Sequence, residues 1–403
     1  MSAVLKRQQA APGPATRRTP ATPLAGYDPW LLGVALLLLA LGLVMVASAS
    51  ITIADRSFDA PLHYFWRQSF AAVLGIALAA AAMRLPLKLW EQTSLALLLA
   101  GLGLLLLVLI PGLGVEINGA MRWIRLGPVN LQASEPVKLC VIVYMAGYLV
   151  RQAEAMRATL SGFIRPVLVL TLVAALLLLQ PDYGAAVVLF ATGLGMMFLG
   201  GVPLGRFFAW MGVAAAALIS LAILSPYRMQ RLMSFTDPWQ DPYNTGFQLT
   251  QALIAFGRGD WFGVGLGGSV QKLFYLPEAH TDFVYSVIAE ELGFVGSTVV
   301  ILLFCFIVRR AFTIGQLAIQ AGQAFAAYLA YGIGLLIGIQ TFINIGVNMG
   351  ILPTKGLTLP LLSYGSNSLV ITCLMIGLLL RIDYETRNST RARVPAKAGR
   401  HGG

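Results

Sequence analysis

The sequence predicts an all-α polytopic membrane protein with about ten transmembrane helices, both termini in the cytoplasm, and a large structured periplasmic loop between the seventh and eighth spans. Of its 403 residues, 58% are hydrophobic and only 11% are charged, whereas soluble domains carry about a quarter charged residues. Apolar runs of about 20 residues, long enough to cross a bilayer as helices, recur along the chain. Lipid is therefore expected to be the solvent for most of the protein.

The apolar runs divide the chain into three parts. We expect disordered basic cytoplasmic tails at residues 1–28 and 382–403, and a membrane domain at residues 29–381 with its periplasmic loop at about 226–282. Lys and Arg are denser in the tails and in the segments that this arrangement places inside, which sets the orientation. The expected spans are 30–50, 65–83, 92–110, 133–150, 163–180, 184–200, 207–225, 283–308, 322–348 and 357–381.

Charge and cysteine content exclude some functions. The net charge is +11, but no basic stripe is interleaved with stacking aromatic residues, so no nucleic-acid partner is expected. Cys140, Cys305 and Cys373 lie inside apolar runs without the spacing of a zinc site. We interpret all three as packing residues.

The long outer loop contains two distinctive segments. Residues 247–256 have apolar residues at helical spacing, which predicts a short helix that lies in the membrane interface or folds over the outer ends of the spans. Six glycines follow between Gly257 and Gly268. Such a segment could cradle a phosphate through backbone N–H groups or form a close-packed loop, and the sequence leaves both open.

Glu278, His280 and Asp282 come together where this loop meets the eighth span. Desolvation at a membrane boundary raises the pKa of a carboxyl group toward that of a useful general base. Thr281 or Asp282 could equally cap the helix. A metal site at His280 and Asp282 lacks further ligands, so no metal ligand is predicted.

A second outer segment carries Arg122, Trp123 and Arg125, followed by Glu135 and Lys138. An arginine pair suits bidentate phosphate binding, and Trp123 suits anchoring at the interface. Anchoring of the arginines to anionic lipid headgroups is the alternative. Glu135 and Lys138 are three residues apart and are expected to pair on the first turn of the fourth span.

Further polar residues suggest a cleft open to the outside. Ionisable residues inside a span face a cavity or a partner, and because neighbours in a helix point in different directions, one of Glu290 and Glu291 is expected to face the bundle interior. Lys355 is the only basic residue of the last outer loop. Six small or polar residues, including Ser363 and Tyr364, interrupt the tenth span, which is tolerated only where the break lines a cavity or is packed in protein.

Five motifs occur in order within residues 28–384 and together resemble the SEDS family (shape, elongation, division and sporulation). The chain resembles the division branch of this family more than its elongation branch, because of its long basic N-terminal tail and the particular residues in its motifs. The family usually has a second glycine where Ser366 stands, and we expect only a local change of turn. The motifs are Gly119-Ala120-Met121-Arg122-Trp123, Ser134-Glu135-Pro136-Val137-Lys138, Gln180-Pro181-Asp182-Tyr183-Gly184, Pro277-Glu278-Ala279-His280-Thr281-Asp282-Phe283 and Leu359-Pro360-Leu361-Leu362-Ser363-Tyr364-Gly365.

The resemblance implies a peptidoglycan glycosyltransferase that polymerises lipid II, an undecaprenyl-pyrophosphate-linked disaccharide-pentapeptide, at the division septum of the bacterial inner membrane. Asp282 would be the essential carboxylate, and Arg122 and Lys355 would share its outer cavity. A divalent cation (Mg²⁺ or Mn²⁺) or basic residues would stabilise the departing pyrophosphate; no other cofactor is expected. The remaining substrate-binding candidates are Trp123, Arg125, Glu135, Lys138, Glu278, His280, Ser363 and Tyr364.

The implied partners are a class B penicillin-binding protein, the septal transpeptidase FtsI, and other membrane proteins of the divisome. A single-span partner is expected to pack against spans eight and nine, where Gly332, Gly334 and Gly338 allow close approach.

Three other functions stay open. A transporter that flips lipid II would use Glu135 and Lys138 as its gate, although no inverted repeat is visible. A scaffold that only recruits a partner would not need Asp282 at that depth. An elongation-type polymerase is the nearest alternative within the enzyme class.

Overall fold

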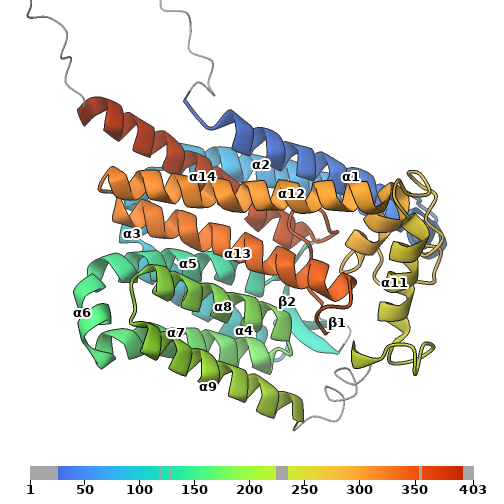
Figure 1. Cartoon of the computed structure of the whole chain (residues 1–403), viewed down its shortest axis with the longest axis horizontal. Helices are drawn as coiled ribbons and strands as arrows, with labels where there is room; N and C mark the ends of the chain where they lie inside the picture. The colour runs from blue at the N-terminus through green and yellow to red at the C-terminus, as the bar shows by residue number, and fades with distance from the viewer. Residues whose placement is uncertain (1–25, 118, 128, 224–234, 354–355, 394–403) are drawn as a thin grey trace, which may run out of the picture.

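The computed structural model describes residues 26–117, 119–127, 129–223, 235–353 and 356–393. In this part of the chain, ten helices of 15 or more residues lie side by side along the long axis of the molecule (Figure 1). They are α1 (Pro29–Phe58), α2 (His63–Arg84), α4 (Ser94–Val108), α5 (Ser134–Arg151), α7 (Leu160–Leu179), α8 (Tyr183–Leu199), α9 (Leu204–Ile223), α12 (Val284–Gln320), α13 (Ala324–Asn348) and α14 (Ser366–Arg393).

The bundle has two different ends. The end where α1 begins and α14 ends is called the inner end here, and it also carries the short helices α3 (Leu87–Gln92) and α6 (Ala153–Ala158). At the opposite, outer end, α11 (Phe247–Gly259) runs across the bundle (Figure 1). This helix was expected from the apolar spacing of residues 247–256.

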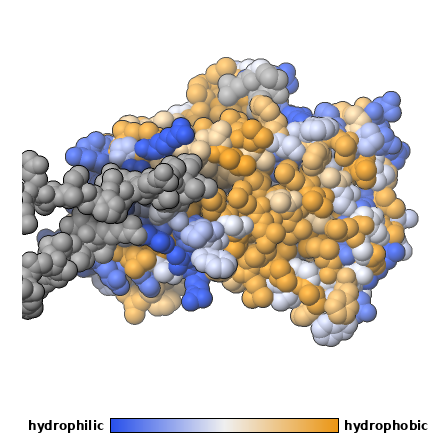
Figure 2. Space-filling model, turned by 90° about the horizontal axis from the view of Figure 1, so that it is seen from above, coloured by the Kyte–Doolittle hydropathy of each residue, from blue (hydrophilic) through white to orange (hydrophobic). Residues whose placement is uncertain are grey.

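A helix lies at each of the ten expected positions. Among the described residues, six helices are long and apolar enough to cross a membrane: α1, α2, α7, α12, α13 and residues Ser366–Ser389 of α14. The apolar helices α4 and α8 are shorter. A count of ten spans therefore stays a prediction. Figure 2 shows a broad hydrophobic surface between two more hydrophilic ends, as expected for a bundle with lipid around its middle.

Contacts at the inner end bring the two described ends of the chain together. The ring of Tyr27 stacks on that of Tyr384 with 4.9 Å between centroids, and Arg310 forms an ion pair with the buried Asp28. Asp28 also caps α1, since its Oδ1 accepts from the N–H of Trp30 at 3.1 Å. Because α1 begins where α14 ends, the arrangement agrees with both termini on one side of the membrane.

The last two expected boundaries at the inner end were wrong. The eighth span was expected to end at residue 308, but α12 continues through Arg309 and Arg310 to Gln320. The C-terminal tail was expected from residue 382, but α14 continues to Arg393. Ion pairs four residues apart, such as Arg387 with Asp383 at 2.8 Å, support this extra length.

The all-α prediction missed a small antiparallel sheet at the outer end. It has the order β1-β2-β3 and consists of β1 (Gly114–Ile117), β2 (Ala120–Leu126) and β3 (Val129–Gln132). Gly119 and Gly127 have φ values of +74° and +63°, which tight hairpin turns require and glycine adopts readily. The arginines that helical spacing would place on one face are therefore on a strand.

The glycines of α13 pack inside the protein. A Cβ at Gly332 would lie 2.8 Å from Met196 Sδ, and one at Gly334 would lie 2.9 Å from the Cβ of Ala311. They allow α13 to approach α8 and α12 closely, so the expected docking of a partner helix on these glycines was wrong. All three cysteines are free, and Cys305 is exposed rather than packed.

The outer loop is fastened to a kink in α12. The helix breaks at Gly293, whose φ is 68° and ψ is −166°. Beside the kink, the backbone N–H groups of Val264 and Gly265 donate to the carbonyls of Glu290 and Glu291 at 3.0 and 3.1 Å. A Cβ at Gly263 would lie 2.1 Å from the Glu291 carbonyl oxygen. The glycine-rich segment therefore serves close packing, and these N–H groups are not free to bind phosphate.

Glu290 and Glu291 are both fully buried, which the sequence did not predict. Glu291 accepts from Lys272 Nζ at 2.7 Å and from Ser48 Oγ of α1 at 2.7 Å. Glu290 pairs with Arg258 at 3.2 Å. The outer loop covers a side of α12 that an isolated helix would expose, which gives each carboxylate a cation.

We expect Glu291→Ala to destabilise the protein by about 3–5 kcal/mol, because it leaves the buried Lys272 without a counter-charge. Lys272→Met combined with Glu291→Leu should recover most of the loss. The thermal unfolding midpoint in detergent measures both, with the exposed Arg125→Gln as control. Equal midpoints for Glu291→Ala and the control would contradict the assigned role of the pair.

Candidate active site

The site begins with a tight turn at Pro277–Phe283, just before α12. The N–H groups of Thr281 and Phe283 donate to the carbonyl of Glu278 at 3.1 and 3.2 Å. The hydroxyl of Thr281 donates to the Glu278 carboxylate at 2.6 Å. Glu278 has a φ of 56°, a left-handed conformation that is uncommon for a residue with a side chain. This turn sets the direction of Asp282.

Asp282 is fixed through its backbone rather than its side chain. The side-chain amides of Asn344 and Asn348, one turn apart on α13, each donate to the Asp282 carbonyl at 2.9 Å. No hydrogen bond or ion pair joins the Asp282 carboxylate to the described residues. A Cβ at Gly356 would lie 3.0 Å from Asp282 Oδ2. The carboxylate is therefore held beside the last outer loop with its oxygens available.

Lys355, the residue before Gly356, was predicted to belong to this site. It lies outside the described residues.

The pKa of the Asp282 carboxyl is raised from 3.8 to about 7. Burial is the largest cause; the negative charges of Glu278 and Asp182 also raise this pKa, whereas Arg122 lowers it. Charges act at this strength only over short distances in a partly desolvated site. The motifs that contain Arg122, Asp182, Glu278 and Asp282 therefore meet at one place.

Arg122 reaches this place from β2. Its Nε donates to the carbonyl of Gln180 at 3.2 Å, and its Nη2 donates to the carbonyl of Pro181. Side chains alternate along a strand, so Trp123 and Arg125 lie on the other face of β2, and Arg125 is exposed. The expected pairing of Arg122 with Arg125 on one phosphate was wrong, because a separation of three residues shares a face in a helix but not in a strand.

Glu135 and Lys138 form the predicted ion pair on the first turn of α5, with 2.9 Å between Nζ and Oε1. Lys138 Nζ also donates to Gln340 Oε1 on α13 at 3.0 Å. Both charged residues are buried. The pair thus joins α5 to α13, and Lys138 has little freedom to reach a substrate.

His280, Tyr364 and Tyr64 of α2 form an aromatic cluster behind the turn. The ring of Tyr64 is centred 4.7 Å from His280 and 4.9 Å from Tyr364. The Tyr364 N–H donates to the His280 carbonyl at 2.8 Å. Burial lowers the pKa of His280, and the charge of Glu278 raises it. The cluster joins the turn before α12 to the stretch before α14.

The first three residues of the polar stretch expected to interrupt the tenth span (363–365) precede the helix, and its last three form the first turn, since α14 begins at Ser366. Ser363 is buried; its Oγ accepts from the Leu359 N–H at 2.8 Å and its carbonyl accepts from Gln68 Nε2 at 3.0 Å. Asn367, next to the position that departs from the family pattern, donates to the Asn130 carbonyl at 2.8 Å. Ser363 therefore shapes the backbone instead of facing the site.

The described residues contain no group of three or more His, Cys, Asp or Glu that could hold a metal ion. The two carboxylates near Asp282 each accept a hydrogen bond from the protein. Glu278 accepts from the Thr281 hydroxyl, and Asp182 caps α8 by accepting from the Ala185 N–H at 3.3 Å.

The parts played by Asn344, Asn348, Tyr64 and Asp182 were not predicted from the sequence. The two asparagines carried a signal, because two amides four residues apart in an apolar helix mark one polar face. Tyr64 carried none, since its importance comes from contacts with residues more than 200 positions away in the chain.

A bundle of apolar helices with a partly buried carboxylate among charged residues at its outer end defines a multi-pass membrane protein with a polar site at one membrane face. Residues 29–388 match the model of the FtsW, RodA and SpoVE family, described as "Cell cycle protein". The chain belongs to this family, the SEDS family.

Two relatives named "Probable peptidoglycan glycosyltransferase FtsW" are similar to most of the chain. The relative from Nitrosococcus halophilus is 57% identical over 92% of this chain and 95% of its own length. The relative from Legionella pneumophila is 52% identical over 91% of this chain and 93% of its own length.

Two solved structures share the fold. A chain described under "Structural coordination of polymerization and crosslinking by a peptidoglycan synthase complex" has a TM-score of 0.74 and 31% identity, and the match covers 89% of this chain and 98% of that one. The rod shape determining protein RodA of Thermus thermophilus has a TM-score of 0.66 and 30% identity, over 89% of this chain and 96% of that one.

We expect the Asp282 carboxyl to titrate with a midpoint near pH 7, and Glu278→Gln to lower this midpoint. The sign follows because removing a neighbouring negative charge makes ionisation of Asp282 easier. Infrared difference spectroscopy of the protonated carboxyl band measures the midpoint, and the band is assigned by its loss in Asp282→Asn. The exposed Glu116→Gln is the control; an unchanged midpoint in Glu278→Gln would contradict the electrostatic account.

Proposed function

We propose that the chain is a peptidoglycan glycosyltransferase that polymerises lipid II into glycan strands during septal cell-wall synthesis. The high identity to relatives named FtsW over almost their full length supports both the activity and the role in division. One structural observation carries the proposal: the carboxylate of Asp282 is partly buried, has no partner among the described residues, and has a pKa of about 7.

In the proposed reaction, Asp282 acts as the general base. The attacking group is a sugar hydroxyl of one lipid-linked glycan, and such a hydroxyl is a poor nucleophile at neutral pH. Asp282 takes its proton as the oxygen bonds to the anomeric carbon of the second sugar, and the lipid pyrophosphate leaves from that carbon with inversion. A base with a pKa near the working pH is both ionised and basic enough to help, typically by 10²–10⁴-fold.

The departing pyrophosphate needs positive charge, and the described cations differ in their suitability. Lys138 is held by Glu135 and Gln340 in a buried contact. Arg125 lies on the other face of the sheet. Arg122 is near enough to lower the pKa of Asp282 and is the candidate among these three. Lys355 precedes Gly356, which lies against Asp282, and is proposed as a second cation.

Two features favour an enzyme over a transporter of lipid II. A gate must break and re-form, whereas Glu135, Lys138 and Gln340 form a closed buried network that joins two helices. The free carboxylate lies at one end of the bundle, before the first residue of α12, rather than at its middle. A transporter site is expected near the bilayer midplane.

A penicillin-binding protein is proposed as the partner, specifically a class B enzyme and, for division, the septal transpeptidase FtsI. This proposal is supported by the fold shared with a chain of a complex that couples polymerization to crosslinking. Enrichment at the septum and association with other divisome membrane proteins belong to the same proposal.

We expect Asp282→Asn to reduce polymer formation from labelled lipid II by at least about 10²–10⁴-fold, because the amide cannot accept the proton. Thermal stability should be unchanged, since the side chain makes no hydrogen bond or ion pair with the described residues and Asn has nearly the same shape. The exposed Asp55→Asn is the matched control. Transbilayer movement of lipid II without polymer in the wild type, or polymer from Asp282→Asn at the wild-type rate, would refute the assignment.

Gly356→Ala should lower the turnover number by about 10-fold or more, because the new methyl group displaces the Asp282 carboxylate, and small displacements of a catalytic group are costly. The thermal midpoint should change little, since the methyl group meets only this one side chain. Gly33→Ala, where a Cβ has open space, is the control. Full activity of Gly356→Ala would show that the base does not lie against this loop.

A further inference from the structure

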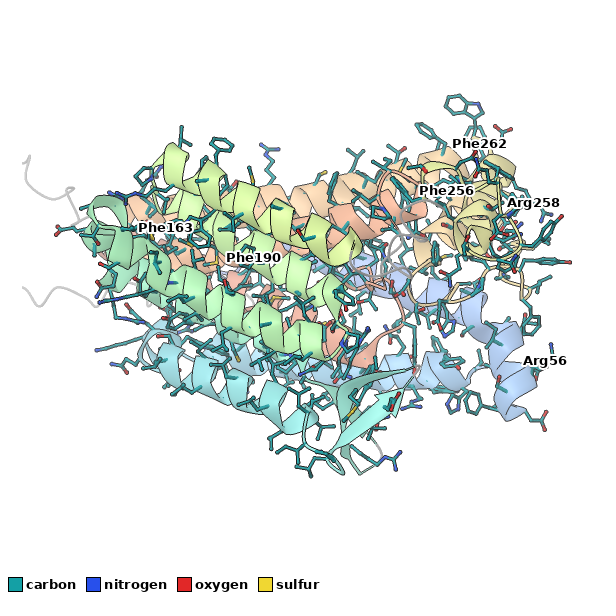
Figure 3. All side chains as sticks on the ribbon, turned by 90° about the horizontal axis from the view of Figure 1, so that it is seen from below. Arg56, Phe163, Phe190, Phe256, Arg258 and Phe262 are labelled. Atoms are coloured by element: carbon teal, nitrogen blue, oxygen red, sulfur yellow. The ribbon has the colours of Figure 1, made fainter. Side chains whose placement is uncertain are left out.

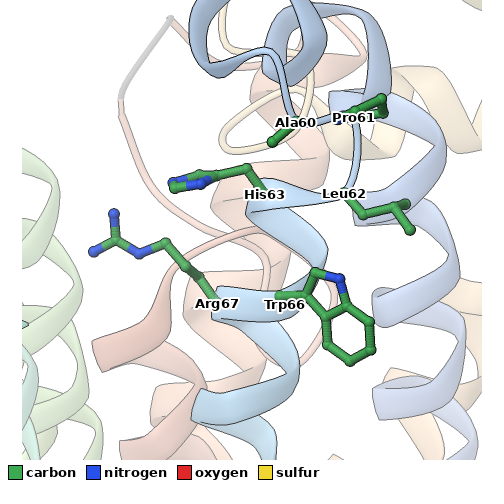
Figure 4. Close-up of a pocket in the computed structure, with 6 residues that line it drawn as sticks. All are labelled: Ala60, Pro61, Leu62, His63, Trp66 and Arg67. Carbon is green, nitrogen blue, oxygen red and sulfur yellow. The ribbon is translucent and has the colours of Figure 1, made fainter.

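A pocket lies at the outer turn between α1 and α2, apart from the residues discussed so far. Its volume is about 500 Å³, and it is lined by Ala60, Pro61, Leu62, His63, Trp66 and Arg67. Figure 4 shows His63 and Arg67 extending to one side of α2, while Leu62 and Trp66 extend to another. The pocket therefore combines an apolar wall with one cation and one imidazole.

The polar groups of this pocket have no partners in the described part of the chain. Arg67 is exposed and forms no hydrogen bond or ion pair there. The Nε2 atom of His63 is buried and also lacks a hydrogen-bond partner. The His63 ring is held in place, since it stacks on Phe58 with 4.1 Å between centroids. Buried polar atoms are rarely left unpaired, so His63 Nε2 points to a ligand. Arg67, which is exposed, adds hydrogen-bond donors that no described residue uses.

The pocket adjoins the Asp282 site through α2. Tyr64 contacts His280, two residues before Asp282. Gln68 donates to the Ser363 carbonyl at 3.0 Å and accepts from the Gly365 N–H at 3.3 Å. The positive charge of Arg67 also lowers the pKa of Tyr364, which burial raises. A ligand that lies between Arg67 and Asp282 would thus contact both the pocket and the Asp282 site.

The depth of the pocket selects the ligand. α2 is one of the helices that can span a membrane, and Arg67 lies about 6 Å below its first residue by the rise of an α-helix. Trp66, with 65% of its surface exposed, is suited to the headgroup region. A ligand here must carry a compact anionic group beside an apolar chain, because the wall is apolar and the free groups are basic.

We propose that Arg67 and His63 bind the pyrophosphate of a polyprenyl-linked substrate, with Leu62 and Trp66 against the first units of its lipid chain. The proposal rests on the function proposed above and adds a further cation site to the proposed pair of Arg122 and Lys355. Arg122 donates to two backbone carbonyls of the loop before α8, whereas Arg67 keeps all its donors. A polymerase that joins two lipid-linked chains needs an anion site for each lipid.

Binding of geranylgeranyl pyrophosphate tests the pocket without catalysis. The protein carries Asp282→Asn and sits in nanodiscs of phosphatidylcholine, and the dissociation constant is measured by thermophoresis. Arg67→Gln should raise this constant about 10- to 100-fold, the effect of losing charge-assisted hydrogen bonds, and Arg67→Lys should recover part of the loss. Arg56→Gln, an exposed arginine of the same outer turn that lies over the Phe274 ring, is the matched control and should bind normally.

Two competitors distinguish the sources of the anion. Inorganic pyrophosphate should compete weakly, and phosphatidylglycerol should not compete. Equal binding by Arg67→Gln and Arg56→Gln, or displacement by phosphatidylglycerol at the level of the polyprenyl compound, would overturn the proposal.

Kinetics with otherwise wild-type protein separate binding from structure. Arg67→Gln should raise the KM for lipid II with an unchanged thermal midpoint, because Arg67 supports no described contact. If the wild type makes no polymer while binding still depends on Arg67, the proposed function fails and the pocket stands. If polymer forms but its KM and the binding constant ignore Arg67, the pocket fails and the function stands.

Discussion

The outer site depends on the two amides of α13 that hold the Asp282 carbonyl. Asn344 and Asn348 each donate to it at 2.9 Å, so the backbone is fixed while the carboxylate stays without a described partner. If the carboxylate itself made those hydrogen bonds, its pKa would fall well below its ordinary value. Holding the residue by its main chain is therefore what allows burial to raise the pKa of the side chain to about 7.

Other buried charged side chains at the outer end, unlike the Asp282 carboxylate, form ion pairs. Glu290, Glu291 and Lys138 are each paired and buried. The two glutamates fasten the outer loop to α12, and Lys138 joins α5 to α13. Figure 3 shows Arg258 and Phe262 at the outer end with Arg56, away from Phe163 and Phe190 in the bundle. The Asp282 carboxylate and the Arg67 guanidinium, in contrast, have no hydrogen-bond partner among the described residues.

Much of the fold could be predicted because apolar length and turn signals are local properties. The positions of the ten helices, the helix at residues 247–259 and the Glu135–Lys138 pair follow from spacing within one element. The sheet at residues 114–132 was missed because two arginines three residues apart also fit a helix, and only strand pairing excludes that. The burial of both Glu290 and Glu291 was missed because the loop that covers them is a tertiary feature.

The sequence by itself determined that Asp282 lies at the junction of a polar loop and an apolar helix, since both segments are continuous in the chain. Only the tertiary structure decided which groups surround it. Arg122, Asp182 and Gly356 come from three separate segments, and electrostatic effects and contacts act through space rather than along the chain. For the same reason Arg67, four residues into α2 and unremarkable in the sequence, becomes a neighbour of the site only after folding.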